Sequence, residues 1–167
     1  GETINTLYEW MDPRYLSTRT FSAPTQEERE RPSMWRFWRA LPKKGRMGIA
    51  AGSWYSWPIA ERIAGDLSRA DFDQRMDELN RFEEMLVNEG ALILKFWIHL
   101  SKTAQRERLQ AIEANPLTRW RVTKASWDRL KTYDKLQEVA GHLLRTTNTP
   151  WAPWIIVEGT DDRYRSL

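Results

Sequence analysis

Apolar residues recur at three- and four-residue spacing along much of the chain, and shorter continuous apolar runs lie between these stretches. The first pattern is typical of amphipathic helices and the second of buried strands. Helices are predicted over residues 2–11, 25–41, 58–64, 70–89, 102–114 and 126–145. Strands are predicted over residues 15–23, 47–51, 91–100 and 154–157. Because strands alternate with helices, we expect an α/β fold with a parallel sheet between helices.

Capping residues support these boundaries. Thr25 is followed three residues later by Glu28, which predicts a capping box at the start of a helix. Ser68 and Ser101 are placed to cap the helices that follow them, and Gly90 is placed to end one. Pro32 falls inside the helix predicted over residues 25–41, so we expect a kink there.

Two apolar runs are expected to form buried strands, and the longer is continuous enough to be buried on both faces, as parallel strands usually are. They are MGIAA at residues 47–51 and ALILKFWIHL at residues 91–100. Lys95 interrupts the second run, and an unpaired buried ammonium is costly. We therefore expect Lys95 to face an anion or a carboxylate, or to lie near an edge. His99 is expected to be a hydrogen-bonded core residue instead of a base.

Composition narrows the classes of protein. The 167 residues carry a net charge of +3 and a pI of about 9.3, which permits an anionic partner without requiring one. The absence of cysteine excludes disulfides and thiolate metal sites and fits a reducing, cytoplasmic compartment. Two histidines are too few for a histidine-rich metal site. No apolar run approaches the roughly 18 residues that a membrane span needs, so we expect no membrane association.

A first group of cations lies just before the strand at residues 47–51. Five occur within eleven residues: Arg36, Arg39, Lys43, Lys44 and Arg46. Arginine and lysine both pair with phosphate oxygens, so this group could grip a phosphate chain. A solvated basic surface explains the same residues, and both interpretations remain open.

A second group begins after the strand at residues 91–100. The amino end of a helix offers free N–H groups to anions, and Lys102 and Arg106 share a face of that helix while Arg108 lies elsewhere. Residues 119–131 continue the basic character. This region could be a lid over a phosphorylated substrate or a solvated pair of helices.

Other chemistry is weakly indicated. The chain has no GxxxxGK[ST] loop, and no pair of carboxylates is placed for acid–base work. Ten tryptophans, several next to arginines, raise the possibility of a nucleic-acid-binding module that stacks bases. Most of these tryptophans occur at core-like spacing, so we do not favour this alternative.

Three long motifs carry a family resemblance. WRFWRALPKKGRMGIAAGSWY, LILKFWIHLSKTAQRERL and RTTNTPWAPWIIVEGTDDRYRSL, in this order, resemble the polyphosphate kinase 2 family. The resemblance implies a P-loop kinase-like fold with a helical lid, and phosphoryl transfer between polyphosphate and a nucleoside mono- or diphosphate with Mg²⁺. YEWMDPR and VEGTDDRYRSL look like the amino-terminal half of two-domain polyphosphate:AMP phosphotransferases. That likeness implies a second homologous domain, an oligomer and conversion of AMP to ADP.

Two departures from the family pattern affect the chemistry. The family's P-loop precedes a helix like that at residues 2–11, so the first strand, the P-loop and its lysine are expected to be missing here. The family also has Asp-Arg, a metal anchor and a phosphate-gripping arginine, where this chain has Ala51 and Gly52 before Ser53. Phosphoryl transfer depends on such charges. We therefore expect residues 1–167 to form one incomplete domain, a degenerate supporting half with a lid at about residues 102–134.

The resemblance also suggests site residues. Arg108 falls on the arginine of the family's SKxxQxxR lid motif, and Lys44 and Arg46 fall in the basic turn along the family's polyphosphate path. With the charge groups above, the candidates for binding polyphosphate or nucleotide are Arg36, Lys44, Arg46, Lys95, Lys102, Arg106 and Arg108. The catalytic residues and metal ligands stay unassigned. Alternatively, the domain still catalyses transfer, with Glu61 or Asp66 holding Mg²⁺.

Overall fold

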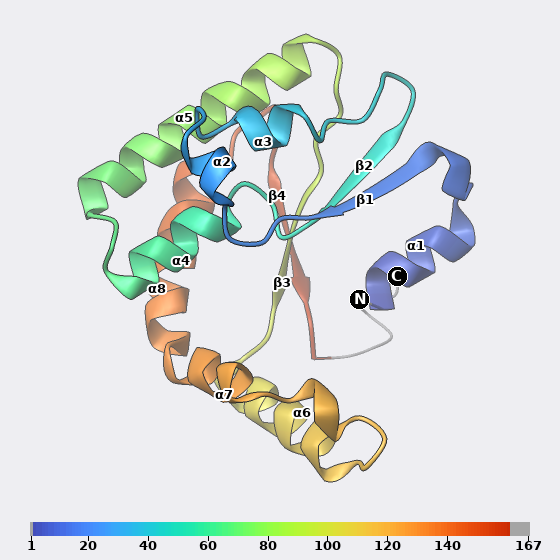
Figure 1. Ribbon diagram of the computed structural model, residues 1–167, viewed down its shortest axis with the longest axis vertical. Helices are drawn as coiled ribbons and strands as arrows, with labels where there is room; N and C mark the ends of the chain where they lie inside the picture. The colour runs from blue at the N-terminus through green and yellow to red at the C-terminus, as the bar shows by residue number, and fades with distance from the viewer. Residues whose placement is uncertain (1, 161–167) are drawn as a thin grey trace. The chain divides into compact units, whose positions relative to one another are not determined.

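The computed structural model describes residues 2–160 and divides the chain into two compact units. The first unit extends to Glu61 and the second begins at Arg62, so the boundary falls within helix α4 (Ser56–Ala64). Each unit contains its own pair of parallel strands together with helices (Figure 1). The expected α/β class with parallel strands is therefore confirmed.

The first unit is built on two short strands. β1 (Leu16–Thr20) and β2 (Met47–Ala51) pair in parallel, with a register from Leu16 opposite Met47 to Thr20 opposite Ala51. Helix α1 (Glu2–Trp10) precedes β1, and its Tyr8 hydroxyl lies 3.0 Å from Thr18 Oγ1. The remaining elements are a 3₁₀ helix η1 (Pro13–Tyr15), α2 (Gln26–Arg29) and α3 (Trp35–Trp38).

The single helix predicted over residues 25–41 is wrong. The Thr25–Glu28 capping box is present and begins α2, but α2 ends at Arg29 and α3 begins only at Trp35. Pro32 lies between them and has no N–H to continue the first helix. Its carbonyl accepts a hydrogen bond from the N–H of Trp35 at 2.8 Å, which starts the next turn.

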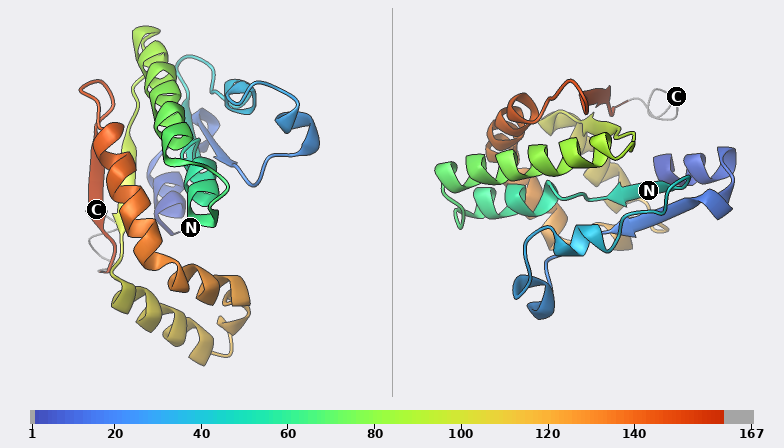
Figure 2. Two further views of the ribbon diagram at one scale, coloured as in Figure 1. Left: turned by 90° about the vertical axis from the view of Figure 1, so that its left-hand side faces the viewer. Right: turned by 90° about the horizontal axis from the view of Figure 1, so that it is seen from above.

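The second unit places two long helices beside a second strand pair. β3 (Lys95–His99) and β4 (Trp154–Glu158) run parallel, with Lys95 opposite Trp154. The helices are α5 (Arg69–Asn88), α6 (Lys102–Ala114), α7 (Lys124–Lys131) and α8 (Tyr133–Thr146), with a 3₁₀ helix η2 (Arg119–Arg121). α5 and α8 lie side by side (Figure 2). Their buried side chains form the core: Phe72, Met76, Leu79, Phe82, Ala140 and Leu143.

Several boundaries in this unit follow the sequence and one does not. Ser68 and Ser101 cap α5 and α6 as expected, and Gly90 takes a φ of +88° after α5. The helix predicted over residues 126–145 is instead two helices, α7 and α8. The hydroxyl of Thr132 donates to the carbonyl of Arg129 at 3.0 Å, an alternative bond that accompanies the break.

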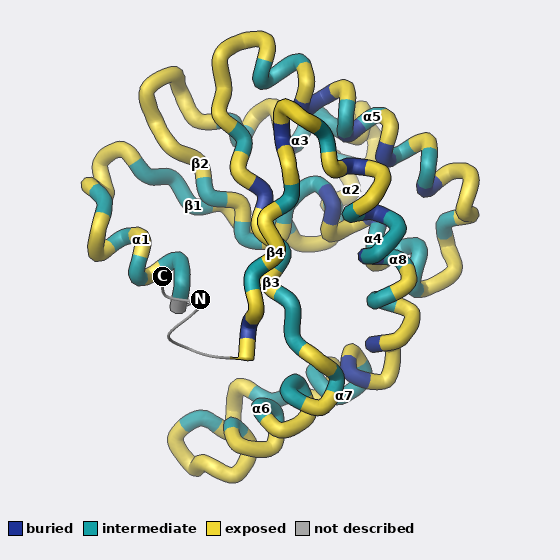
Figure 3. Tube along the Cα trace, turned by 180° about the vertical axis from the view of Figure 1, so that it is seen from behind, coloured by how far each residue is buried: buried dark blue, intermediate teal, exposed yellow. Residues whose placement is uncertain are grey.

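The strands are shorter and more exposed than predicted. β3 covers five residues of the expected ten, and Phe96 and Ile98 are 56% and 48% exposed. Met47 in β2 and Ile156 in β4 are exposed as well (Figure 3). Within residues 2–160 each sheet has two strands, and both pairs carry exposed apolar side chains. The expectation of buried strands, with residues 91–100 buried on both faces, is therefore wrong for the described structure.

Candidate functional site

The carboxyl end of β2 leads directly into Gly52 and Ser53. Ligand sites of parallel sheets form at this end of the strands. Gly52 has a φ of +77°, in the left-handed region that favours glycine. A Cβ atom there would lie 3.6 Å from Ser56 Oγ, an ordinary contact, so backbone conformation is the constraint and space is not. A small cavity of about 110 Å³ adjoins this turn, lined by Phe21, Ser22, Arg36, Phe37, Ser53 and Ser56 among others.

Arg36 lies in helix α3 and its side chain contacts the loop that follows β1. Its Nη2 donates to the carbonyl of Ser22 at 3.0 Å, and its Nη1 lies 3.5 Å from Oε2 of Glu28. The guanidinium also lies 5.3 and 5.5 Å from the ring centroids of Phe21 and Phe37. Only 10% of the side chain is exposed, and the neighbouring Glu28 carboxylate offsets its charge. Its Nε is buried and has no hydrogen-bond partner among residues 2–160.

Lys44 and Arg46 lie at the opposite end of β2. The strand between Arg46 and Gly52 is extended, which separates them by roughly 20 Å. The guanidinium of Arg46 donates to the carbonyl of Arg14 and lies 5.5 Å from the ring centroid of Tyr15. Lys44 is exposed. The basic group that the sequence suggested is therefore divided between two ends of one strand, with Arg36 at one and Arg46 at the other.

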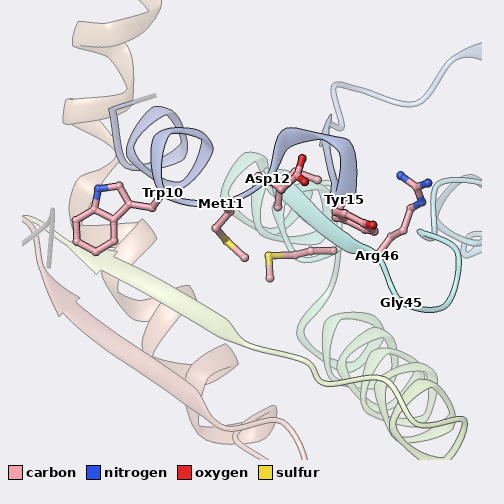
Figure 4. Close-up of a pocket in the computed structure, with 8 residues that line it drawn as sticks. Trp10, Met11, Asp12, Tyr15, Gly45 and Arg46 are labelled. Atoms are coloured by element: carbon pink, nitrogen blue, oxygen red, sulfur yellow. The ribbon is translucent and has the colours of Figure 1, made fainter.

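A larger cavity, of about 540 Å³, lies at the amino ends of β1 and β2 (Figure 4). Its lining is largely apolar and includes Trp10, Met11, Tyr15 and Met47. Asp12 also lines it, but Nη2 of Arg14 lies 2.7 Å from this carboxylate, and that bond lowers the pKa of the carboxyl. This cavity was not predicted from the sequence. The large apolar residues beside the starts of both strands were the available signal.

Lys95 is enclosed within the second unit. Its Nζ donates to Oε2 of Glu83 and to the carbonyl of Thr147, both at 2.7 Å, and lies 5.0 Å from the ring centroid of Trp154. The side chain is 5% exposed, and burial lowers the pKa of the ammonium although the bond to Glu83 opposes that change. Lys95 thus faces a carboxylate. A phosphate would have to displace Glu83, so Lys95 is a structural residue and leaves the group of binding candidates.

The start of α6 is tied to the start of α8. Ser101 Oγ accepts the N–H of Ala104 at 3.1 Å and caps α6. Lys102 Nζ lies 2.5 Å from Oδ2 of Asp134, and the hydroxyl of Tyr133 donates to the carbonyl of Leu100 at 2.9 Å. Lys102 therefore holds the base of a helical hairpin formed by α6, η2 and α7.

The two arginines of α6 differ in environment. Arg106 is exposed and Arg108 is partly buried. α6 contacts both η2 and α7, so the range predicted as a lid is a helical hairpin. Arg106 and Arg108 belong to the second unit, whereas Arg36 and Arg46 belong to the first.

The family model described as polyphosphate kinase 2 matches residues 1–167. The chain belongs to the polyphosphate kinase 2 family. The polyphosphate:AMP phosphotransferase of Pseudomonas aeruginosa is 47% identical over 167 residues, which are the whole of this chain and 34% of that protein. The AMP/ADP-polyphosphate phosphotransferase of Meiothermus ruber is 31% identical over 164 residues, which are 98% of this chain and 61% of that protein.

Solved structures agree with this assignment. A crystal structure described as a polyphosphate kinase 2 from Pseudomonas aeruginosa matches with a TM-score of 0.83 and 44% identity, over 99% of this chain and 31% of that one. Polyphosphate kinase 2 from Arthrobacter aurescens matches with a TM-score of 0.93 and 26% identity, over 98% of this chain and 58% of that one. The chain thus spans about a third of the length of the first curated relatives it matches. The P-loop kinase-like fold implied by the resemblance is confirmed.

Phosphotransferases generally use a divalent metal, and proteins bind Mg²⁺ through oxygen ligands such as carboxylates. The cavity at the carboxyl end of β2 is lined by no carboxylate among the residues described. No group of three or more Asp, Glu or His residues able to hold a metal occurs within residues 2–160. These residues do not fit a Mg²⁺ ion held by the protein alone.

The polyphosphate kinase 2 motif at the carboxyl terminus, from Asp161 of VEGTDDRYRSL onward, lies outside the described residues. Within the described part, no helix is both long enough and apolar enough to cross a bilayer.

Proposed function

We propose that the protein containing this chain transfers a phosphoryl group from polyphosphate to AMP, giving ADP, and that this chain is a supporting half that binds polyphosphate without catalysing the transfer. In the reaction, an oxygen of the AMP phosphate forms a bond to the terminal phosphorus of polyphosphate. The bridging P–O bond breaks, and polyphosphate leaves one unit shorter. The names of the relatives at 47% identity support this choice of substrates.

One observation carries the assignment of a supporting role: Ala51 and Gly52 occupy the carboxyl end of β2. Neither residue has a charged side chain that could bind a metal or neutralise a phosphate. The nearby Arg36 is offset by Glu28, so the charge stabilisation on which phosphoryl transfer depends is weak at this end. Exposed cations elsewhere, such as Lys44 and Arg106, still suit a polyanion.

The remaining parts of the proposal follow from the family. Mg²⁺ would accompany the substrate phosphates, with its protein ligands outside the residues considered above. A second homologous domain would carry the chemistry, and the protein would be an oligomer. A cytoplasmic location agrees with the cysteine-free sequence. We do not expect a membrane or a nucleic acid to be the main partner.

The test uses the full-length protein with Mg²⁺, long-chain polyphosphate and AMP, and follows ADP formation. We expect Ser53→Ala to leave kcat unchanged, because this end of β2 takes no part in transfer. We expect Lys44→Ala to raise the KM for polyphosphate with little change in kcat. A tenfold fall in kcat for Ser53→Ala would show that this half catalyses the reaction.

Glu61 and Asp66 test the competing function, a domain that still catalyses with a substitute metal ligand. We expect Glu61→Ala and Asp66→Ala to keep both kcat and any Mg²⁺-dependent rise in Tm. Loss of that rise together with kcat in either variant would favour an active domain. A further variant, Ala51→Asp/Gly52→Arg, restores the family residues. If the unmodified half already turns over as fast as an intact family member, degeneracy is the wrong inference.

A further inference from the structure

The tip of the helical hairpin exposes an aromatic side chain between two arginines. Trp120 is 76% exposed and Leu117 is 82% exposed. Arg119 and Arg121, on either side of Trp120 in η2, are exposed as well. The sequence from residue 114 to residue 127 contains no Asp or Glu. The tip therefore combines an open indole with a local excess of positive charge.

Hydrogen bonds hold this tip in one conformation. Asn115 Oδ1 accepts the N–H of Leu117 at 3.0 Å, and Thr118 Oγ1 donates to the carbonyl of Ile112 at 2.9 Å. The indole Nε1 of Trp120 donates to the carbonyl of Leu117 at 3.0 Å. The ring is thus oriented in advance and its only donor is satisfied, so a ligand would meet the ring's apolar surface at a low cost in conformational entropy.

The guanidinium groups of Arg119 and Arg121, next to Trp120 in the sequence, can pair with a ligand. No ion pair involves Arg119 or Arg121 in the part of the chain that the structure describes, and Trp120 has no cation–π contact there. In a 3₁₀ helix, successive side chains point about 120° apart. The two arginines therefore leave the backbone on either side of Trp120, and neither guanidinium lies over its ring in the described residues.

Polyphosphate alone does not explain this arrangement. It would pair with the arginines but has no flat apolar face to cover an indole. A nucleotide has both a base that stacks on aromatic rings and phosphates that pair with arginine. An indole with cations on both sides is the combination that single-stranded nucleic-acid sites use, and it suits a free nucleotide equally well.

We propose that the hairpin tip binds a nucleotide, with its base stacked on Trp120 and its phosphates paired with Arg119 and Arg121. This inference rests on the proposed function for the class of substrate, and it adds the residues that recognise the base. The base belongs either to free AMP or ADP or to a nucleic-acid strand, and the experiment separates these sources.

The experiment reads the tip directly in the full-length protein labelled with 5-fluorotryptophan. The ¹⁹F resonance of residue 120 is assigned by its absence in Trp120→Phe. We expect this resonance to shift on addition of AMP or ADP and to stay in place on addition of tripolyphosphate. A single-stranded oligonucleotide is the third probe. A shift with the oligonucleotide but not with AMP would assign the site to nucleic acid.

Affinities of variants complete the test. Stacking is worth about 1–3 kcal/mol per base, so Trp120→Leu should weaken nucleotide binding at the tip roughly 5- to 150-fold, and Trp120→Phe should keep most of it. Trp10→Leu is the matched control, since Trp10 is also 76% exposed but lies outside the hairpin, and we expect no change. Arg119→Ala/Arg121→Ala should weaken binding and reduce its dependence on salt.

The outcomes separate the two proposals. An unmoved ¹⁹F resonance with AMP, ADP and oligonucleotide alike, or unchanged affinity in Trp120→Leu, overturns the inference even if the protein makes ADP. A shifted resonance in a protein that makes no ADP from AMP and polyphosphate supports the inference and overturns the proposed function. Because Trp120 is exposed, the variants should unfold at the wild-type temperature, and circular dichroism checks this.

Discussion

Lys95 and Glu83 form a buried ion pair that joins strand β3 to helix α5, with 2.7 Å between Nζ and Oε2. The side chain of Glu83 is fully buried and that of Lys95 is 5% exposed. The ammonium of Lys95 donates to the carboxylate of Glu83 and also to the carbonyl of Thr147. Removal of one partner leaves an uncompensated charge in the core, whereas removal of both does not.

We expect Lys95→Met to lower the free energy of unfolding by about 3–5 kcal/mol, because Glu83 then lacks its counter-ion. Lys95→Met/Glu83→Leu should recover much of that loss. Urea unfolding of the three proteins measures both effects. Arg75→Ala is the control, because the Arg75–Glu78 pair is about one-third exposed and should contribute less than about 1 kcal/mol. Equal losses in Lys95→Met and Arg75→Ala would contradict the prediction.

The same lysine predicts a pH dependence. Burial lowers the pKa of Lys95 in the folded state, while the unfolded chain keeps a value of about 10.4. Between these two pKa values the unfolded state binds more protons, so the free energy of unfolding rises with pH across this window. This gain in the free energy of unfolding is complete above the pKa that Lys95 has in the unfolded chain. It is lost as the pH falls through the pKa that Lys95 has in the folded state. Urea unfolding at a series of alkaline pH values should show no such rise in the Lys95→Met/Glu83→Leu protein. If its free energy of unfolding changed with pH in the same way as that of the wild type, Lys95 would not be the group responsible.

Gly52 yields a prediction about the backbone. With a φ of +77°, Gly52→Ala should cost about 1 kcal/mol or more, since alanine tolerates this region poorly. Gly52→Asn should cost less, because asparagine adopts left-handed conformations more readily. Thermal unfolding compares the two. Equal Tm values for Gly52→Ala and wild type would mean that the turn relaxes. The family's arginine at this position would meet the same constraint, so Ala51→Asp/Gly52→Arg must be tested for folding before its activity is interpreted.

Arg36 is expected to stabilise the first unit more than it binds ligand. Arg36→Lys keeps the charge but loses the combined contacts with Ser22 and Glu28, so the free energy of unfolding should fall by about 1–3 kcal/mol. Arg39→Lys is the control, since the exposed Arg39 contacts mainly the ring of Trp35. Polyphosphate affinity of the folded Arg36→Lys protein should stay within about twofold of wild type. A large loss of affinity at full stability would assign Arg36 to the ligand.

Local signals in the sequence predicted the elements well. The caps at Thr25, Ser68 and Ser101 mark helix starts in the structure, and the parallel strands follow from the alternation of apolar runs with helices. The breaks near Pro32 and Thr132 were not predicted as helix ends. The first break lies where Pro32 supplies no N–H to continue α2, and the second lies where the hydroxyl of Thr132 donates to the carbonyl of Arg129.

The candidate site was less predictable, because proximity in sequence does not fix which end of a strand a residue occupies. Arg36 and Arg46 are ten residues apart, yet they lie at opposite ends of β2. Lys95 was open to three interpretations until its carboxylate partner, twelve residues earlier in α5, was placed beside it. The expected burial of the strands was wrong. Apolar residues show that a strand favours burial, but they do not show which helices or strands pack against it.

The connection between β3 and β4 also affects how the chain folds. β3 ends at His99 and β4 begins at Trp154, so residues 100–153 close a loop about twice as long as residues 21–46, which join β1 to β2. A doubling of loop length costs only about 0.6 kcal/mol of closure entropy, but contacts between distant residues slow the search for the native state. The whole helical hairpin is part of this long connection. Ribosomal synthesis therefore releases every element of the hairpin before β4 exists to pair with β3.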